Sequence, residues 1–460
     1  MDATLFFFAT ILLLTGLALL AIYIWTENGS IFDPVAVFWG GFIMYVPVAM
    51  LGVAFKFPGR ATATVAVEAA ALAVAGTVMY ILGLYSGKAR GFVASIPIPA
   101  PTFGPAQLIA MWIFTISMVA FSLTGSVVVG QAWSQVVGAL VNSNVGAAAL
   151  LSVLGFFMFR GNPIARLFMV AGFFFIIGML IVFSWSRRPQ VGLVLAAFGF
   201  IYVFRMRNSG AFKKGLLLIS TAAVAGLLLL YLGATRGNRF YGSAAGAAYG
   251  IFSSENFADF IGGLDINYYT YEFAVQRIPR EREFLWGSGY VTAFLFFIPR
   301  AIWESKPVSS GSIISRMWYS TNYLENNLGI VPFGELYMNF TAIGVILGMW
   351  VSGRVVRILN TYLRQNPDNM ALWLAWLVCI PDLATIWRGD FTAMYVSSVT
   401  KTVLFLGLAW VSSTLFPSPK KATPPSMAPV RTATPPPGAA VRPPTPWVPG
   451  YRRMPHGRSR

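Results

Sequence analysis

The sequence predicts an all-α polytopic membrane protein with about eleven transmembrane helices. Of its 460 residues, 57% are hydrophobic and 11% are charged, whereas a soluble domain carries about 25% charged residues. Long apolar runs recur along the chain, and a helix of about 20 apolar residues is long enough to cross the hydrocarbon layer. Basic residues flank many of these runs, as they do in polytopic membrane proteins.

The apolar runs give the expected helices in order. They lie near residues 4–25, 33–55, 62–85, 106–131, 144–160, 163–186, 189–205, 214–234, 330–352, 370–387 and 392–415. The first run has no charged segment before it and no small-residue cleavage site, so we expect a retained membrane helix rather than a signal peptide. The turn sequence Arg160-Gly-Asn-Pro163 joins two of the runs closely.

Lysine and arginine in the short loops predict the orientation. The loops 205–214 and 353–369 and the tail 416–460 are basic, and the intervening runs put all three on one side, which we expect to be the cytoplasm. Eleven spans put the N-terminus outside, although Lys56 and Arg60 would then lie outside too. We predict four parts: a bundle of about eight helices at 1–234, a large periplasmic loop at 235–329, about three helices at 330–415 and a disordered tail at 416–460.

The composition of the tail argues against nucleic-acid binding, and the rarity of histidine and cysteine argues against metal chemistry. The net charge is +17, but eight of the 33 basic residues and 13 of the 28 prolines lie in 416–460. We expect an extended tail that contacts anionic headgroups at most, and no nucleic-acid partner. The chain has one histidine, His456, and one cysteine, Cys379. We therefore predict no metal site, no cofactor and no histidine base in the apolar body.

The segment 235–329 is much longer than an ordinary connection, whose median length is roughly 4–6 residues. It contains three tryptophans and many tyrosines, so its composition is not that of a disordered chain. Apolar residues repeat at helical spacing behind the N-cap candidates Ser253 and Ser254, at Phe257, Phe260, Ile261 and Leu264. We expect amphipathic helices at the outer leaflet, and a re-entrant stretch at 290–298, which is apolar but too short to span.

Charge also concentrates in this segment, which holds 16 of the 49 charged residues: Arg236, Arg239, Glu255, Asp259, Asp265, Glu272, Arg277, Arg280, Glu281, Arg282, Glu283, Arg300, Glu304, Lys306, Arg316 and Glu325. Helix ends expected on the same side add Arg187, Arg188, Glu335, Arg388 and Asp390. Because a charge inside the bilayer costs about 2.5–3.5 kcal/mol, we expect a polar cavity or a solvated lid. The alternative is a wet loop with surface ion pairs.

Three stretches of the loop, Trp286-Gly-Ser-Gly-Tyr290, Phe297-Ile-Pro-Arg300 and Trp303-Glu-Ser-Lys-Pro307, resemble the outer-loop signature of the oligosaccharide repeat-unit polymerases, the Wzy family. The order of elements is similar too, and further likenesses are Ser186-Arg187-Arg188, Gly334-Glu335-Leu-Tyr337, Asn339-Phe340 with Gly344, and Arg388-Gly-Asp390. The resemblance covers the architecture of roughly residues 1–415, and is sharpest over 286–344 and 386–390. The proline-rich tail departs from the pattern.

The resemblance implies an enzyme at the periplasmic face of the bacterial inner membrane. Such enzymes transfer a growing glycan from its undecaprenyl diphosphate to the non-reducing end of an incoming repeat unit. The product is an O-antigen, a capsule or an exopolysaccharide. The implied partners are the lipid-linked oligosaccharide, membrane lipid and, as a candidate, a polysaccharide chain-length regulator.

Each candidate residue has a chemical role to fill. Arginine binds phosphate oxygens bidentately and stays charged, so fixed cations would stabilise the departing diphosphate without a metal. We assign this role to Arg300, Lys306 and Arg388, with Arg187, Arg188, Arg236, Arg239 and Arg316 as further binding residues. Glu335 and Asp390 would orient or deprotonate the acceptor, or hold an arginine by an ion pair. Trp286, Tyr290 and Trp303 would stack on sugars, or form an interfacial aromatic belt.

Three rival functions differ in what they require. An O-antigen ligase uses the same donor, but its family pattern includes a periplasmic histidine, and this chain has no histidine before the tail. A lipid-linked oligosaccharide flippase would be expected to show internal repeats and broken helices around a midplane site. We find no repeat, and we expect few charges within the membrane, Glu68 and Asp382 being the exceptions. The third rival is an accessory scaffold in polysaccharide export.

Overall fold

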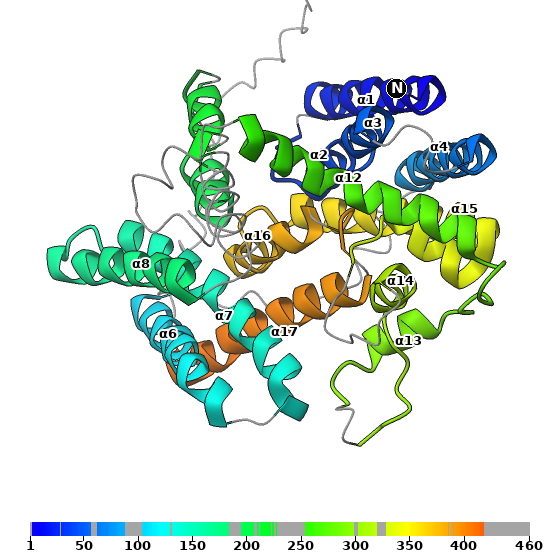
Figure 1. Cartoon of the computed structure of the whole chain (residues 1–460). Helices are drawn as coiled ribbons and strands as arrows, with labels where there is room; N and C mark the ends of the chain where they lie inside the picture. The colour runs from blue at the N-terminus through cyan, green and yellow to red at the C-terminus, as the bar shows by residue number, and fades with distance from the viewer. Residues whose placement is uncertain are drawn as a thin grey trace, which may run out of the picture. The chain divides into compact units, whose positions relative to one another are not determined.

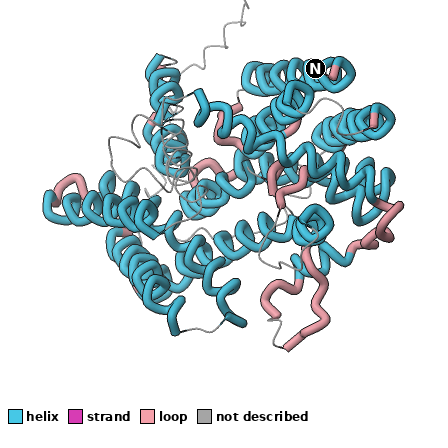
Figure 2. The backbone as a smooth tube through the Cα atoms, viewed as in Figure 1, coloured by secondary structure: helices cyan, strands magenta, loops and turns pink. Residues whose placement is uncertain are grey.

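The computed structural model describes residues 2–27, 29–56, 62–87, 104–128, 131–183, 195–206, 209–210, 212–221, 223–224, 227, 254–298, 302–319, 328–384, 386–389 and 391–417. Within these ranges the chain forms helices joined by turns and loops, and none of it forms a β-strand (Figures 1 and 2). The predicted all-α fold is confirmed for the part of the chain described.

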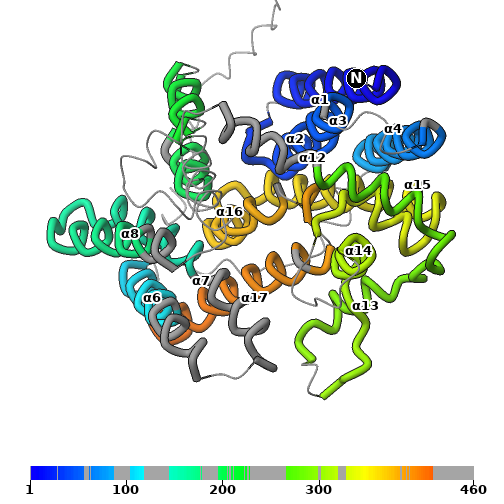
Figure 3. Tube along the Cα trace, viewed as in Figure 1, coloured from blue at the N-terminus to red at the C-terminus, as the bar shows by residue number. Residues whose placement is uncertain are grey.

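The helices follow the chain in the order that Figure 3 traces. They are α1 (Ala3–Thr26), α2 (Pro34–Tyr45), α3 (Pro47–Lys56), α4 (Ala63–Tyr85), α6 (Pro105–Val128), α7 (Gln131–Met158), α8 (Pro163–Phe183), the π-helical turn η1 (Ile201–Arg205), α12 (Ser254–Arg277), α13 (Ser288–Phe294), α14 (Ser310–Tyr319), α15 (Pro332–Gln365), α16 (Met370–Ala384) and α17 (Phe391–Leu415). The predicted turn at 160–163 separates α7 from α8.

Five helices are long enough and apolar enough to cross a membrane: Ala3–Thr26, Pro34–Phe55, Thr64–Tyr85, Pro332–Gln365 and Met394–Leu415. Shorter apolar helices occupy Pro105–Met118, Val145–Met158, Pro163–Ile176, Leu195–Phe204 and Met370–Leu383. Together with the helical residues 212–221, they place described helix in each of the eleven apolar runs. The count of eleven spans remains a prediction, and residues 418–460 of the predicted tail lie outside the described residues.

The α4 and α15 helices pack with their backbones in close contact (Figure 1). A Cβ atom at Gly83 would lie 2.0 Å from the carbonyl oxygen of Trp350, and one at Gly353 would lie 2.1 Å from that of Tyr80. Small residues allow such an approach between apolar helices, where van der Waals packing provides the attraction. The Arg354 guanidinium completes the contact by donating to the carbonyls of Ser86 and Gly87 at the C-terminus of α4.

The α15 helix is broken near its start, at Phe340 and Thr341. Thr341 has φ 66° and ψ −166°, a conformation that glycine alone adopts readily. The segment 332–339 folds back along the rest of α15, because a Cβ at Gly348 would lie 2.3 Å from Cδ2 of Leu336. Twelve residues of straight helix would separate these positions by about 18 Å. The long part of α15 therefore begins after the break, and the short segment 332–339 lies beside it.

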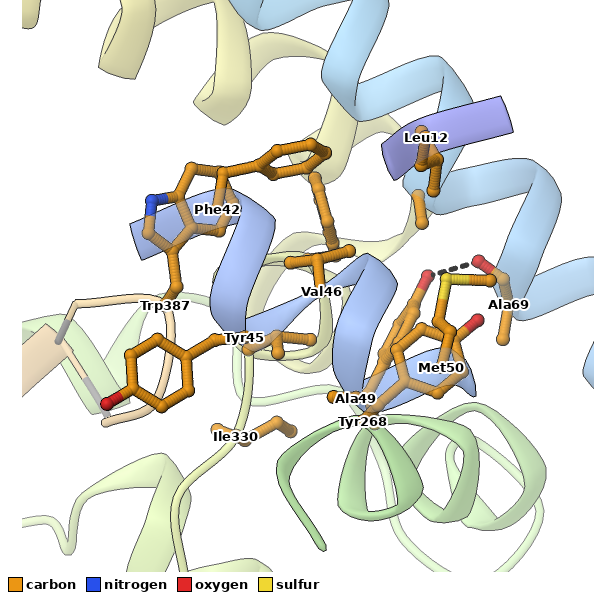
Figure 4. Packing of buried hydrophobic residues seen from close by; sticks show 14 of the residues in the cluster. Leu12, Phe42, Tyr45, Val46, Ala49, Met50, Ala69, Tyr268, Ile330 and Trp387 are labelled. Carbon is orange, nitrogen blue, oxygen red and sulfur yellow. Dashed lines mark hydrogen bonds between the residues drawn. The ribbon is translucent and has the colours of Figure 1, made fainter. Parts of the chain in front are cut away.

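The predicted helix behind Ser254 is α12, and it belongs to the helical core. It packs against α2, α3, α4 and α15, with Tyr271 donating a hydrogen bond of 2.9 Å to the carbonyl of Ala69 in α4. Figure 4 shows Tyr268 of α12 close to Ala49 and Met50 of α3. The segment 235–329 is therefore more than a surface lid, since its first described helix is part of the largest hydrophobic cluster.

A polar network ties the first helix to the far end of α15. The Glu27 carboxylate accepts a hydrogen bond of 2.8 Å from Arg357 and lies 3.5 Å from the guanidinium of Arg364. Nearby, the buried Tyr23 hydroxyl donates to Asp33 over 2.9 Å. These contacts hold the ends of α1, α2 and α15 together on the side opposite to α12.

A second hydrophobic cluster joins the remaining helices. It contains residues of α6, α7, α8, α16 and α17, and α2 contributes to both clusters through residues such as Val37 and Phe38. The α16 and α17 helices follow one another in the chain and pack against each other.

Replacing Gly83 by valine should destabilise the protein by about 1–3 kcal/mol or more, because the added atoms would meet the Trp350 carbonyl of α15. Thermal unfolding of the purified protein in detergent would measure the loss. Gly407→Val in α17 is the matched control, since a Cβ at Gly407 would meet nothing within 4 Å. Equal unfolding temperatures for the two variants would contradict the packing described here.

Glu272 of α12 should make stability depend on pH. Its side chain is 2% exposed and its Oε1 accepts no hydrogen bond among the described residues, so burial, and then the charge of Asp2, raise the pKa of Glu272 to about 8. Between pH 4.5, its ordinary value, and about 8, the folded protein keeps a proton that the unfolded chain releases. Stability should therefore fall as the pH rises through this window.

The variant Glu272→Gln should remove this part of the pH dependence. Its gain in unfolding temperature over the wild type should be smallest near pH 4.5 and largest above pH 8. The control is Glu304→Gln, because the side chain of Glu304 is exposed, and it should keep the wild-type profile. Parallel profiles for wild type and Glu272→Gln would refute the assignment.

Candidate functional site

The short segment 332–339 brings the predicted site residue Glu335 to the start of α17. Glu335, which is 2% exposed, accepts a hydrogen bond of 2.6 Å through Oε2 from the backbone N–H of Phe391. This N–H belongs to the first residue of α17, where helical N–H groups have no partner within the helix and a negative charge is favourable. Glu335 thus fixes the position of the α17 N-terminus directly after Arg388-Gly-Asp390.

Asn339 joins the same segment to the loop helices. Its Oδ1 accepts from the N–H of Gly289 over 3.3 Å, and its Nδ2 donates to Ser310 and to the carbonyl of Glu335. The Gly289 carbonyl in turn accepts from the hydroxyl of Thr392 in α17. A Cβ at position 289 would lie 2.7 Å from the Ser310 oxygen, so only glycine allows α13, α14, α15 and α17 to meet here.

Aromatic rings from three helices cluster beside the junction, the place where α13, α14, α15 and α17 meet. Tyr290 stacks on Phe340 at a centroid distance of 5.7 Å and lies 4.9 Å from the ring of Phe391. Phe391 stacks on Tyr395, and Phe294 contacts both rings. Burial, and then the nearby charge of Glu335, raise the pKa of the Tyr290 hydroxyl well above its usual value. Tyr290 and Glu335, predicted separately, are therefore neighbours.

Arg388 lies in the turn between α16 and α17, next to a well-anchored tryptophan. Trp387 donates from its indole nitrogen to the Phe38 carbonyl over 2.9 Å and packs edge-on against Phe42 (Figure 4). The backbone carbonyl of Arg388 lies against Gly329, where a Cβ would be 1.9 Å away. The partly exposed Arg388 guanidinium makes no hydrogen bond or ion pair with any residue of the described ranges, so a fixed backbone carries a cation that is available to a ligand.

The Lys306 ammonium has a different environment. Lys306 is 9% exposed, and its Nζ donates to the carbonyls of Phe296 and Ile298 over 3.2 and 2.9 Å. It closes the loop between α13 and α14, a loop that Thr292 also holds by donating to the Pro307 carbonyl. The lysine therefore shapes the backbone just before Pro299-Arg300, a role that sequence reasoning missed.

The three remaining described candidates are Trp286, Trp303 and Arg316. Trp286 is 69% exposed, with φ 48°, and touches Phe284 edge-on. Trp303 is partly exposed and donates from its indole nitrogen to Ser305. Arg316 lies in the last turn of α14 with a buried Nε that makes no hydrogen bond to the part of the chain that the structure describes. The structure does not bring these side chains into contact with Glu335.

Six further candidates lie outside the described residues: Arg187, Arg188, Arg236, Arg239, Arg300 and Asp390. Among the residues that are described, no group of three or more acidic, histidine or cysteine side chains could hold a metal ion. The junction adds Asn339 and Thr392 to the site residues. Asn339 belongs to the Asn339-Phe340 likeness found in the sequence, whereas the only signal for Thr392 is that it stands close to Arg388-Gly-Asp390.

Comparison of the chain with protein-family models, with curated proteins and with solved structures finds no match in any of the three.

Asn339→Ala should destabilise the junction by about 1–3 kcal/mol, because the Gly289 N–H and the Ser310 hydroxyl would be left buried without this partner. The Gly289 amide should also exchange its hydrogen faster, which hydrogen exchange read by mass spectrometry would detect. Asn366→Ala is the control, since Asn366 donates a single side-chain bond within the described residues, to the Tyr362 carbonyl at the end of α15. An unchanged Gly289 amide would show that Asn339 does not hold α13.

Proposed function

We propose that the chain is a membrane glycosyltransferase of the oligosaccharide repeat-unit polymerase type, acting on undecaprenyl-diphosphate-linked oligosaccharides. The observation that carries the proposal is the Arg388 guanidinium, which is partly exposed and unbound by the described residues. Arg388 stands three residues before Phe391, whose backbone N–H donates to the Glu335 carboxylate. A preorganised cation beside aromatic rings suits a ligand that combines a diphosphate with sugars.

In the proposed reaction, an acceptor hydroxyl attacks the anomeric carbon of the donor sugar. The new C–O bond forms while the bond to the lipid diphosphate breaks, and the electron pair of that bond leaves on the diphosphate oxygen. The transition state resembles an oxocarbenium ion, as in glycoside hydrolysis. Diphosphate leaves without protonation, so catalysis needs fixed positive charge where negative charge grows, which Arg388 and Arg300 would supply without a metal.

In this proposal the two carboxylates, Glu335 and Asp390, have different roles. Glu335 is 2% exposed and bonded to the α17 N-terminus, so we assign it to orienting the turn that carries Arg388. Asp390 is the candidate acceptor for the hydroxyl proton. Lys306 supports the segment before Arg300. The proposed binding residues remain Arg187, Arg188, Arg236, Arg239, Arg316, Trp286, Tyr290 and Trp303.

The proposal includes a location. The enzyme would lie in a bacterial inner membrane, with 235–329 in the periplasm and the tail in the cytoplasm, because the lipid-linked donor is polymerised at the outer face. Five helices suited to crossing a membrane support a membrane location. A chain-length regulator is the proposed protein partner.

A lipid-linked oligosaccharide flippase is the second candidate, and the break in α15 favours it. Broken helices often surround the binding sites of transporters, and Thr341 is a strained residue at such a break. The two functions separate in proteoliposomes: a polymerase lengthens the glycan, whereas a flippase moves a labelled lipid to the other leaflet without lengthening it. A ligase would instead transfer the glycan to lipid A-core.

Purified protein given lipid-diphosphate-linked repeat units should produce a ladder of longer glycans. Arg388→Ala should lower the rate by about 10²–10³-fold, because the charge on the departing diphosphate would lose a fixed cation, and Arg388→Lys should keep part of the activity. Arg282→Ala is the control, since Arg282 is an exposed arginine in the segment 235–329, and it should be fully active. No ladder from a folded wild-type protein with its proper substrate would refute the polymerase proposal.

A further inference from the structure

A buried ion pair joins α16 to α17. The Nζ of Lys401 lies 2.6 Å from Oδ2 of Asp382, and the two side chains are 9% and 8% exposed. The hydroxyl of Ser397 donates to the same carboxylate oxygen over 2.8 Å. The sequence pointed to Asp382 as a charge within the membrane, but Lys401 lies in the apolar run 392–415 and was not recognised.

Lys401 lies inside the candidate span Met394–Leu415, and Asp382 lies near the end of the shorter apolar helix Met370–Leu383. Charges within membrane helices are rare and usually serve a function. Exchanging a buried ion pair for apolar side chains is often neutral or stabilising, whereas fixing the register of two helices is the best attested role of such pairs.

Cys379 adds a further polar link to the α16–α17 contact. The Cys379 thiol lies 3.3 Å from the Thr402 hydroxyl and 3.5 Å from the Ser398 carbonyl. Cys379 and Asp382 stand one turn apart on α16, and their partners stand on one face of α17. Two apolar helices can slide by one turn, about 5.4 Å, and keep similar apolar contacts, but such a slide would break both polar links.

The register of this pair determines the geometry of the candidate site. The connection 385–390 carries Arg388, and the first residues of α17 make the bonds from Phe391 to Glu335 and from Thr392 to Gly289. A one-turn slide of α17 would pull Phe391 out of hydrogen-bond reach of Glu335 and move Arg388 with it.

We propose that Asp382, Lys401 and Ser397 are positioning residues for the site at 388–391. They hold α17 in the one register that places its N-terminus on the Glu335 carboxylate and Arg388 in the turn just before it. The link to turnover rests on the proposed polymerase function, but the link to the Phe391 contact rests on geometry alone.

The Phe391 amide gives a direct readout. An N–H in the first turn of a helix has no partner within the helix, so slow exchange at Phe391 reports its bond to Glu335. In the double variant D382L/K401M, the Phe391 amide should exchange at least tenfold faster while the unfolding temperature stays close to that of the wild type. Ladder synthesis should lose at least tenfold in kcat with little change in KM. The charge swap D382K/K401D should restore both slow exchange and turnover.

The control is E27L/R357M, which removes an inter-helix ion pair at the other end of the bundle and should leave Phe391 exchange and kcat at wild-type values. Slow exchange and normal kcat in D382L/K401M would overturn the proposal. If D382L/K401M does not fold, S397A decides: a two- to fivefold rise in Phe391 exchange supports the proposal, and unchanged exchange overturns it. If the wild type makes no ladder but the exchange results hold, the polymerase proposal fails and the positioning role stands.

Discussion

The candidate site is organised around a hydrogen bond between elements that are distant in the sequence, from the N–H of Phe391 to the carboxylate of Glu335. The acceptor, Glu335, lies on the segment 332–339, which folds back along the rest of α15. The donor, Phe391, is the first residue of α17. In a medium without water, an unpaired N–H is costly, so a buried carboxylate at a helix N-terminus is a strong constraint. The bond fixes where α17 starts, and hence where the turn with Arg388 lies.

The break in α15 makes this bond possible. A straight helix from Pro332 to Gln365 would carry Glu335 away from α13 and α14, whereas the reversal at Phe340 and Thr341 returns it to them. The strained Thr341 costs about 1–3 kcal/mol, and it persists because its neighbours determine the backbone: Asn339 bonds to Gly289 and Ser310, and Phe340 stacks on Tyr290. The strain lies next to the aromatic cluster and is balanced by contacts from three helices.

Much of the fold could be predicted from the sequence, because apolar runs determine helices in a chain with so few charges. Helix α12 was predicted from the spacing of its apolar residues and from the cap candidates Ser253 and Ser254. The break in α15 could not be predicted, since neither proline nor glycine stands at Phe340-Thr341, and such kinks otherwise have a local cause. Here the cause is tertiary. Lys401 was missed because a single lysine barely changes the hydropathy of a long run, and Asp382 was recognised without the partner that explains it.

The site shows the same division between local and distant causes. Sequence reasoning selected Lys306 and Arg388 for the same reason, that both are cations beside apolar runs, yet their surroundings differ.

The Lys306 ammonium is bonded to two backbone carbonyls of its own loop, which compensates its burial and removes it from ready contact with an anion. Arg388 has no such bonds among the described residues, and its backbone is fixed on both sides by Trp387 and Phe391. A cation that binds a ligand needs a charge that no protein group neutralises and a backbone that is held in place. The sequence reveals the charge, but only the contacts of neighbouring residues reveal that the backbone is held. Arg388 has both properties and is therefore a stronger candidate than Lys306 for holding a diphosphate.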